Sequence, residues 1–192
     1  MRFLLCILFL PFISLGQTKE IKDFTLKNVD GEMVALSDYP EAKGFVIIFT
    51  CNHCPFAKLY PERLNELNRN YEALGVPLIA ISSMDTISYE EDTYLKMIEK
   101  AEKEKFSFPY LYDPDQLIAK MFNAQKTPHA FVIWKVGDHF EINYSGAIDD
   151  NGMHPKKVEQ EFVKLAIEEL LAGKEVSVNQ TFSVGCQIYF RK

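Results

Sequence analysis

Two cysteines separated by two residues, in the segment Cys51-Asn52-His53-Cys54, form the group in this sequence best suited to chemistry. The segment directly follows an apolar run at 44–50 and precedes a helical pattern. We therefore expect the sulfurs at a helix N-terminus, where free N–H groups and the helix dipole stabilise a thiolate. A thiolate is the nucleophile of disulfide exchange. The spacing predicts that Cys51, on the exposed side, attacks, and that Cys54, more buried, resolves the mixed disulfide.

The two intervening residues are expected to modulate this pair. As an imidazolium, His53 would stabilise a Cys51 thiolate, which favours the reduced form and makes the disulfide more oxidising. A solvated His53 without such a role fits the sequence equally well. Asn52 is the second expected modulator.

Metal binding is the non-enzymatic alternative for the same spacing. A structural zinc site usually needs four ligands, commonly from two such pairs. No second pair is present, and the remaining candidates match no zinc pattern: His129, His139, His154 and Cys186. A copper(I) or zinc ion on Cys51, Cys54 and a histidine stays open as a metallochaperone hypothesis. The main interpretation includes no metal ligand and no cofactor.

The surrounding pattern predicts an α/β domain. An Asp-Gly turn at 30–31 between apolar runs indicates a hairpin, and the run 44–50 is typical of a strand buried on both faces. Further strands are expected at 76–81, 108–112, 130–134 and 140–144, with helices at 59–74, from Ser88 to about Lys105, from Asp113 to Met121 and from Pro155 to Gly173. Alternating strands and helices favour a mixed central sheet flanked by helices.

The order of these elements, the CNHCPF motif, the segments FPYLYD and SGAIDD, and Thr127-Pro128 before a strand resemble the thioredoxin superfamily. Within it, the chain resembles the redoxin or peroxiredoxin-like branch related to the AhpC/TSA group, over about residues 20–190. The resemblance implies a thioredoxin-like fold with an N-terminal hairpin extension. It also implies a cis Pro128, with Thr127 facing the cysteines and offering its backbone to an extended substrate.

Thiol peroxidase activity, with Cys51 as nucleophile and Cys54 or Cys186 as resolver, is the alternative enzyme function. Typical peroxiredoxins have Thr or Ser three residues before the reactive cysteine and a later Arg. Here Ile48 precedes Cys51 by three residues, and no Arg lies between 69 and 191. Lys126 lacks the forked donors of an arginine. The peroxidase reading is therefore weaker than disulfide exchange.

Both ends of the chain lie outside the predicted domain. Residues 1–16 have one Arg followed by an apolar run and small residues before Gln17, as in a cleavable signal peptide. The thioredoxin-like domain is expected at 17–173, and a tail at 174–192 carries Cys186. This cysteine is interpreted either as a packed free thiol or as a second resolving residue or cap on the cysteine pair.

Composition excludes other classes. The 192 residues are 47% hydrophobic with a formal charge of −6, which argues against disorder and against binding to a phosphate backbone. The sequence therefore leads us to expect an exported, secreted or periplasmic thiol–disulfide oxidoreductase without a membrane span after cleavage. Its expected partners are protein or small-molecule thiols and disulfides and a reducing or oxidising protein. It is expected to be a monomer or weak dimer.

Overall fold

The computed structural model describes residues 19–191, so the predicted signal peptide at 1–16 lies outside the described residues. The strands are β1 Glu20–Ile21, β2 Thr25–Asn28, β3 Met33–Ala35, β4 Gly44–Phe49, β5 Leu78–Ser82, β6 Tyr110–Tyr112, β7 Lys126–Thr127, β8 His129–Val136, β9 His139–Gly146 and β10 Cys186–Gln187. The α-helices are α1 Pro61–Tyr71, α2 Tyr94–Glu104, α3 Leu117–Phe122 and α4 Phe162–Leu171. Five single-turn 3-10 helices connect them.

One mixed sheet forms the centre of the domain, with the strand order β1-β9-β8-β4-β5-β6-β2-β3. β4, β5 and β6 are parallel, whereas β8 and β9 pair as an antiparallel hairpin beside β4. The predicted N-terminal hairpin is confirmed as β2–β3, which extends the sheet beyond β6. The expected α/β class with a mixed sheet between helices is therefore confirmed.

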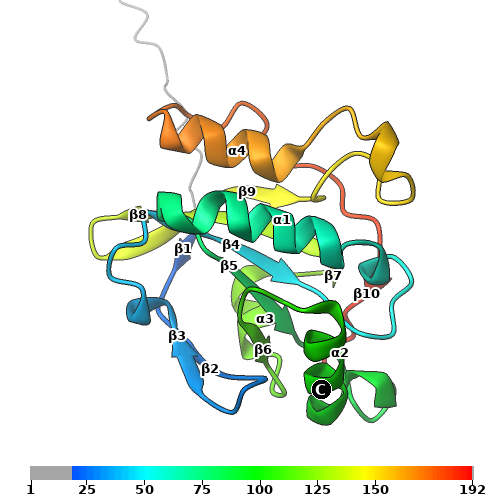
Figure 1. The fold of residues 1–192 in the computed structure, drawn as a ribbon. Coiled ribbons are helices and arrows are strands. Elements are labelled where there is room, and N and C mark those ends of the chain that lie inside the picture. Colours follow the sequence, from blue (N-terminus) through cyan, green and yellow to red (C-terminus); the bar gives the residue numbers. More distant parts are fainter. Residues whose placement is uncertain (1–18, 192) are drawn as a thin grey trace, which may run out of the picture.

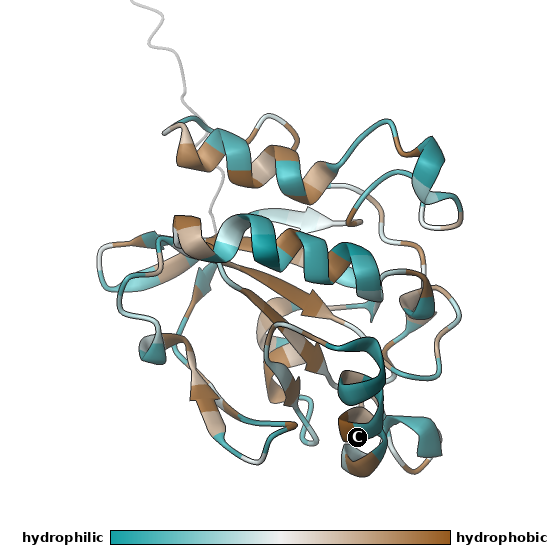
Figure 2. Cartoon of the chain, viewed as in Figure 1, coloured by the Kyte–Doolittle hydropathy of each residue, from teal (hydrophilic) through white to brown (hydrophobic). Residues whose placement is uncertain are grey.

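The central strand β4 is buried on both faces because helices and loops cover each side of the sheet (Figure 1). Successive side chains of a strand point to opposite faces. Val46 and Ile48 pack with residues of α1, α2 and α4, and Ile47 and Phe49 pack with residues of α3 on the other face. Figure 2 shows this arrangement as apolar central strands between helices whose outward faces are hydrophilic.

Three predicted helix starts are wrong. The helix expected from Asp113 begins only at Leu117, whose N–H binds the Asp113 carboxylate. The segment from Ser88 does not open α2, because the Ser88 hydroxyl binds the Asp85 carboxylate and a 3-10 turn at Glu90–Asp92 intervenes before Tyr94. Pro155 begins only a single 3-10 turn, and α4 starts at Phe162. At Ser88 and at Pro155, a cap-like residue or a proline fixes a local turn without continuing into the helix.

Within residues 19–191, no helix combines the length and apolarity needed to cross a bilayer.

Candidate active site

The cysteine pair lies where the buried strand β4 ends, and both sulfurs are reduced and fully buried. The expected position at a helix N-terminus is wrong. Residues 51–56 form bends and turns, a 3-10 turn follows at Ala57–Leu59, and α1 begins only at Pro61. The dipole of α1 acts within its first turn, so it does not reach Cys51. The expectation that Cys51 lies exposed is also wrong.

Thr127, at the end of β7, contacts both sulfurs. Its hydroxyl oxygen lies 3.0 Å from Cys51 Sγ, and its carbonyl oxygen lies 3.1 Å from Cys54 Sγ. The Thr127–Pro128 peptide bond is cis, as the resemblance implied. Thr127 and Pro128, the expected substrate-binding residues, therefore stand beside the cysteine pair.

The two cysteines differ sharply in acidity. The pKa of Cys54 is lowered to about 4, first because the Cys51 thiol donates to it and further because Cys186 and the Ala57 N–H donate as well. Burial, the hydrogen bond with Cys54 and the charge of Asp92 raise the pKa of Cys51 far above its usual range. The Thr127 carbonyl oxygen accepts a hydrogen bond from Cys54 Sγ and so favours the protonated thiol. The donors around Cys54 favour its thiolate and outnumber this one acceptor. The hydrogen bonds around Cys54 thus lower its pKa relative to that of Cys51.

Asp92 fixes the two intervening residues. This fully buried carboxylate accepts the Asn52 backbone N–H with Oδ1 and lies 2.5 Å from His53 Nδ1 with Oδ2. The His53 ring also stacks on Tyr89, with 3.8 Å between the ring centroids. The Asn52 side chain donates to Glu91 O and accepts from Tyr110 OH. His53 is therefore not a freely solvated side chain.

Lys100 is a residue of the site that sequence reasoning missed. The stretch from Glu99 to Lys105 has the charge pattern of a solvated helix face, yet Lys100 Nζ donates to the Cys51 carbonyl oxygen at 2.8 Å. Burial lowers the pKa of this amine. Asp92 was missed as well, because it lies in a run of acidic residues about forty positions from the cysteines. Only the fold brings either residue to the site.

Cys186 belongs to the site. Its backbone N–H donates to Cys54 Sγ at 3.3 Å, and the tail strand β10 pairs with β7 so that Cys186 lies opposite Thr127. Burial and the neighbouring Cys54 raise the pKa of the Cys186 thiol to about 12. Of its two interpretations, the one that places the tail against the cysteine pair agrees with these contacts.

Other polar candidates are engaged elsewhere. His129 accepts the Gln125 N–H and lies 3.1 Å from the Ser145 hydroxyl. Lys126 Nζ lies 4.2 Å from the centroid of the Phe182 ring. Arg63 binds Asp149, and Arg191 binds Pro114 O. The third arginine of residues 19–191, Arg69, is exposed on α1, so no guanidinium is described at the cysteine pair.

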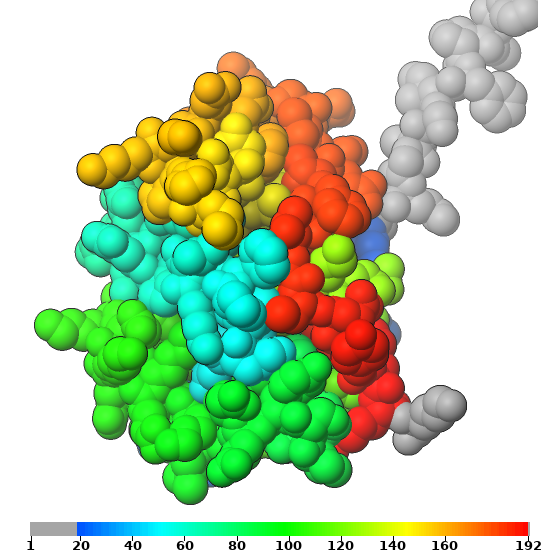
Figure 3. All heavy atoms as spheres, turned by 90° about the vertical axis from the view of Figure 1, so that its right-hand side faces the viewer, coloured from blue at the N-terminus to red at the C-terminus, as the bar shows by residue number. Residues whose placement is uncertain are grey.

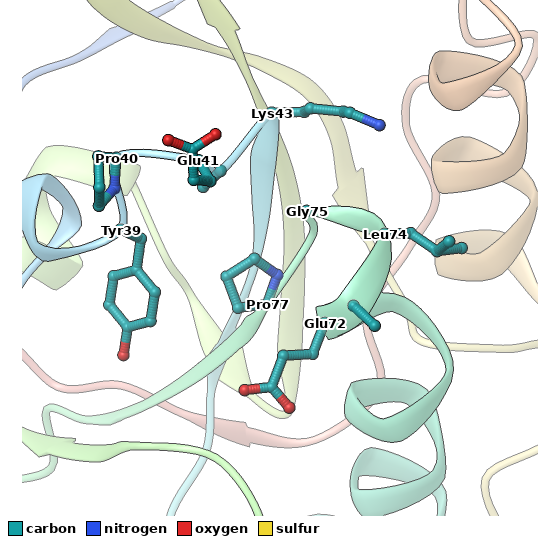
Figure 4. Close-up of a pocket in the computed structure, with 10 residues that line it drawn as sticks. Tyr39, Pro40, Glu41, Lys43, Glu72, Leu74, Gly75 and Pro77 are labelled. Atoms are coloured by element: carbon teal, nitrogen blue, oxygen red, sulfur yellow. The ribbon is translucent and has the colours of Figure 1, made fainter.

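A cavity of about 330 Å³ lies at the opposite end of β4 from the cysteines (Figure 4). Its lining includes Tyr39, Glu41, Lys43, Glu72 and Pro77. Gly44 and Cys51 are seven steps apart along extended chain, so this cavity is roughly 20 Å from the sulfurs. It plays no part in the site.

Solved structures resemble nearly the whole chain. An uncharacterised conserved protein from Geobacillus kaustophilus is 35% identical, with a TM-score of 0.82 over 93% of this chain and 94% of that one. A hypothetical protein from Sinorhizobium meliloti is 28% identical, with a TM-score of 0.82 over 93% and 96%. The exposed lipoprotein thioredoxin of Streptococcus pneumoniae shares the fold at 18% identity, with a TM-score of 0.56 over 79% and 99%.

No curated protein matches the chain. The sequence profile described as the AhpC/TSA family matches residues 18–148, more than half of the chain. Together with the thioredoxin-like fold, this match shows that the chain belongs to the AhpC/TSA family of thioredoxin-like redox proteins.

Proposed function

We propose that the protein is a thiol–disulfide oxidoreductase that exchanges disulfides through Cys51 and Cys54. The observation that carries the proposal is the shared contact of both sulfurs with Thr127, immediately before a cis proline. Two thiols held this close can form and release a disulfide with little rearrangement of the backbone. The exchange needs no cofactor, because a partner thiol or disulfide supplies or accepts the electrons.

A cavity at cis Pro128, lined by several apolar side chains, supports a peptide as one class of substrate. It has a volume of about 270 Å³ and is lined in part by Phe56, Pro128, Met153, Phe182 and Val184. Several of these side chains are exposed although apolar. Such a surface would contact apolar side chains of a protein whose disulfide lies over the cysteines.

The acidity of the pair favours Cys54 as the attacking sulfur, which reverses the roles expected from the sequence. A thiolate attacks, and the lower pKa lies on Cys54. Cys51 would then attack the mixed disulfide and release the reduced substrate. The expected order, with Cys51 first, requires the shared proton to move from Cys51 to Cys54 along their hydrogen bond.

Trapping with a disulfide substrate such as insulin tests both the function and the order. If Cys54 attacks, the double variant Cys51→Ser, Cys186→Ser accumulates a mixed disulfide, since no thiol remains to resolve it. Cys54→Ser then accumulates none. The reverse pattern would establish Cys51 as the attacking sulfur. Wild-type rates of insulin reduction by both Cys51→Ser and Cys54→Ser would refute exchange through this pair.

The peroxidase alternative draws on the lowered pKa of Cys54, because a thiolate is the sulfur nucleophile. It lacks a described guanidinium beside the thiolate, because Arg63 and Arg191 are bound elsewhere. Peroxide consumption with a thiol reductant, compared with insulin reduction by the same preparation, separates the two functions.

Metal binding stays a second candidate because Cys51, His53 and Asp92 offer ligand atoms within 4.8 Å of one another. This set contains a carboxylate where the sequence suggested Cys54. Asp92 already binds His53 and the Asn52 N–H, and Cys51 Sγ contacts the Thr127 hydroxyl, so a metal would have to displace existing hydrogen bonds. Metal analysis of protein purified without oxygen, with His53→Gln as the matched variant, tests this candidate.

Export is proposed on the sequence of residues 1–16, in which Arg2 precedes an apolar run. N-terminal sequencing of protein recovered from outside the cytoplasm is expected to begin at Gln17. Recovery of an intact Met1 would refute cleavage.

A further inference from the structure

The C-terminal tail lies along the cysteine segment. Figure 3 shows the tail, in red, directly beside the segment of residues 50–60, in cyan. The strand β10 of the tail pairs antiparallel with β7, placing Cys186 opposite Thr127 and Gln187 opposite Lys126. This is the backbone edge before cis Pro128 that would otherwise be open to an extended substrate. The tail thus fills the position of a substrate strand.

Gly185 permits this close approach. A Cβ atom at position 185 would lie 2.1 Å from the Thr127 carbonyl oxygen. Any larger residue would therefore push the tail away from Thr127. The glycine directly before Cys186 allows the cysteine to be carried into the site.

The end of the tail is anchored on the far side of Cys186. The Ile188 N–H donates to Gln125 O, and the Ile188 side chain is buried in the core. The fully buried side chain of Gln116 donates to Tyr189 O and accepts the Arg191 N–H. These hydrogen bonds and the buried Ile188 side chain hold the tail, and with it Cys186, at the site.

The sulfur of Cys54 stands between those of the two other cysteines. It hydrogen-bonds the Cys51 side chain and the Cys186 side chain, and it accepts the Cys186 N–H at 3.3 Å. Cys54 is thus within reach of two thiols, one in its own loop and one in the tail.

We infer that Cys186 is a built-in exchange partner of this pair, so that the oxidised protein interconverts between a Cys51–Cys54 and a Cys54–Cys186 disulfide. The inference rests on the proposed function. The tail presents Cys186 as an internal substrate, and the site opens to another disulfide only when the tail leaves β7.

The exchange is a rearrangement with no net oxidation. The Cys186 thiol gives up its proton as its sulfur bonds to Cys54 Sγ and the Cys51–Cys54 bond breaks. The electron pair leaves on Cys51, which takes up the proton lost by Cys186. The first disulfide requires an oxidant. Oxidised glutathione supplies this step by accepting two electrons and two protons from the dithiol to give two molecules of reduced glutathione.

Tryptic mapping of the full chain, equilibrated in glutathione buffers and alkylated, tests the inference. Trypsin leaves Cys51 and Cys54 together in peptide 44–58 and Cys186 in peptide 175–191. A Cys54–Cys186 disulfide joins the two peptides and leaves Cys51 alkylated. We expect this linked form in wild type and, as the main oxidised form, in Cys51→Ser.

Gly185→Ala supplies the decisive variant and Gln187→Ala its matched control. The added methyl group should lower the linked form about tenfold, the change that corresponds to 1.4 kcal/mol, while the Cys51–Cys54 disulfide persists. Gln187 has an exposed side chain, so its replacement should leave the linked form unchanged.

Two outcomes overturn the inference in distinguishable ways. In the first outcome, wild type forms a reversible Cys51–Cys54 disulfide while Cys186 is alkylated at every glutathione ratio, and Cys51→Ser shows no linked form. This outcome removes the tail from the exchange and leaves the proposed function standing. The absence of any reversible disulfide removes the proposed function itself.

Discussion

Asp92 Oδ2 lies 2.5 Å from His53 Nδ1, and this buried contact joins the cysteine loop to the segment that precedes α2. The second oxygen of Asp92 holds the Asn52 N–H. One carboxylate thus fixes the residues between the cysteines from a position about forty residues away. It ties the geometry of the pair to the packing of another element.

Replacing Asp92 tests this connection. Asp92→Ala leaves the Asn52 N–H without its acceptor, and we expect a loss of about 1–3 kcal/mol in the free energy of unfolding. Asp92→Asn should lose less, because its carbonyl oxygen still accepts from Asn52 while its amide donates to a neutral His53. Urea denaturation of both variants measures the difference. Equal losses would contradict a role for the retained acceptor.

The titration of the reduced protein should show one unusually acidic thiol. The pKa of Cys54 is lowered to about 4, so thiolate absorbance near 240 nm should appear as the pH rises through about 4, well below the ordinary thiol range. Cys51→Ala removes the largest stabilising donor and should move this step to higher pH. Cys51→Ser keeps an O–H donor and should move it less.

Two outcomes of that titration would contradict the assignment. A first thiolate step in the ordinary range would show that the Thr127 carbonyl, which favours the thiol, outweighs the donors around Cys54. An unchanged step in Cys51→Ala would show that the hydrogen bond between the two cysteines is not the cause.

Lys100 should contribute to stability through its hydrogen bond to Cys51 O. Lys100→Met removes this donor from a largely buried carbonyl group, and we expect a loss of about 1–2 kcal/mol. Lys103→Met on the same helix is the matched control, because Lys103 is strongly exposed and its change should stay within about 0.5 kcal/mol. Equal effects of the two variants in urea denaturation would count against the contact.

The sequence predicts the strand and the cis proline that position the cysteines better than it predicts where the helices begin. The apolar run at 44–50 predicts a strand buried on both faces, and β4 confirms it with Cys51 just beyond its end. The position of Thr127 and the cis form of Pro128 followed from the resemblance. Helix start signals were less reliable. The 3-10 turns at Glu90–Asp92 and Pro155–Lys157 precede the helices expected from Ser88 and Pro155, and a local pattern cannot show that a helix is delayed.

The residues that surround the cysteines could not be predicted from local sequence patterns, for a different reason. Asp92 and Lys100 lie in charged segments that fit a solvated surface, and only packing against the cysteine loop buries them. The position of Cys186 depends on a strand of two residues, Cys186–Gln187, held by its pairing with β7. No periodicity can be read from so short an element.

Stability should fall in acid because of His129. Burial, and secondarily the charge of Lys126, lowers its pKa from 6.5 to about 4. The neutral ring accepts the Gln125 N–H through Nδ1, which leaves Nε2–H to donate to Ser145, and protonation would remove that acceptor. Between these two pKa values the unfolded chain binds a proton that the folded chain does not, so this contribution is complete above about pH 6.5 and is lost toward pH 4.

Urea denaturation across this pH range measures the effect, with a slope of at most about 1.4 kcal/mol per pH unit for one proton. His129→Gln should be less stable at neutral pH but should show a smaller loss between pH 6.5 and pH 4. His139→Gln is the control. The pKa of His139 is raised by Glu141 and Asp138, so its stabilisation is present below 6.5 and is lost as the pH rises. Removal of His139 should therefore leave the acid loss in place. If His129→Gln keeps the full wild-type loss, groups other than His129 cause it.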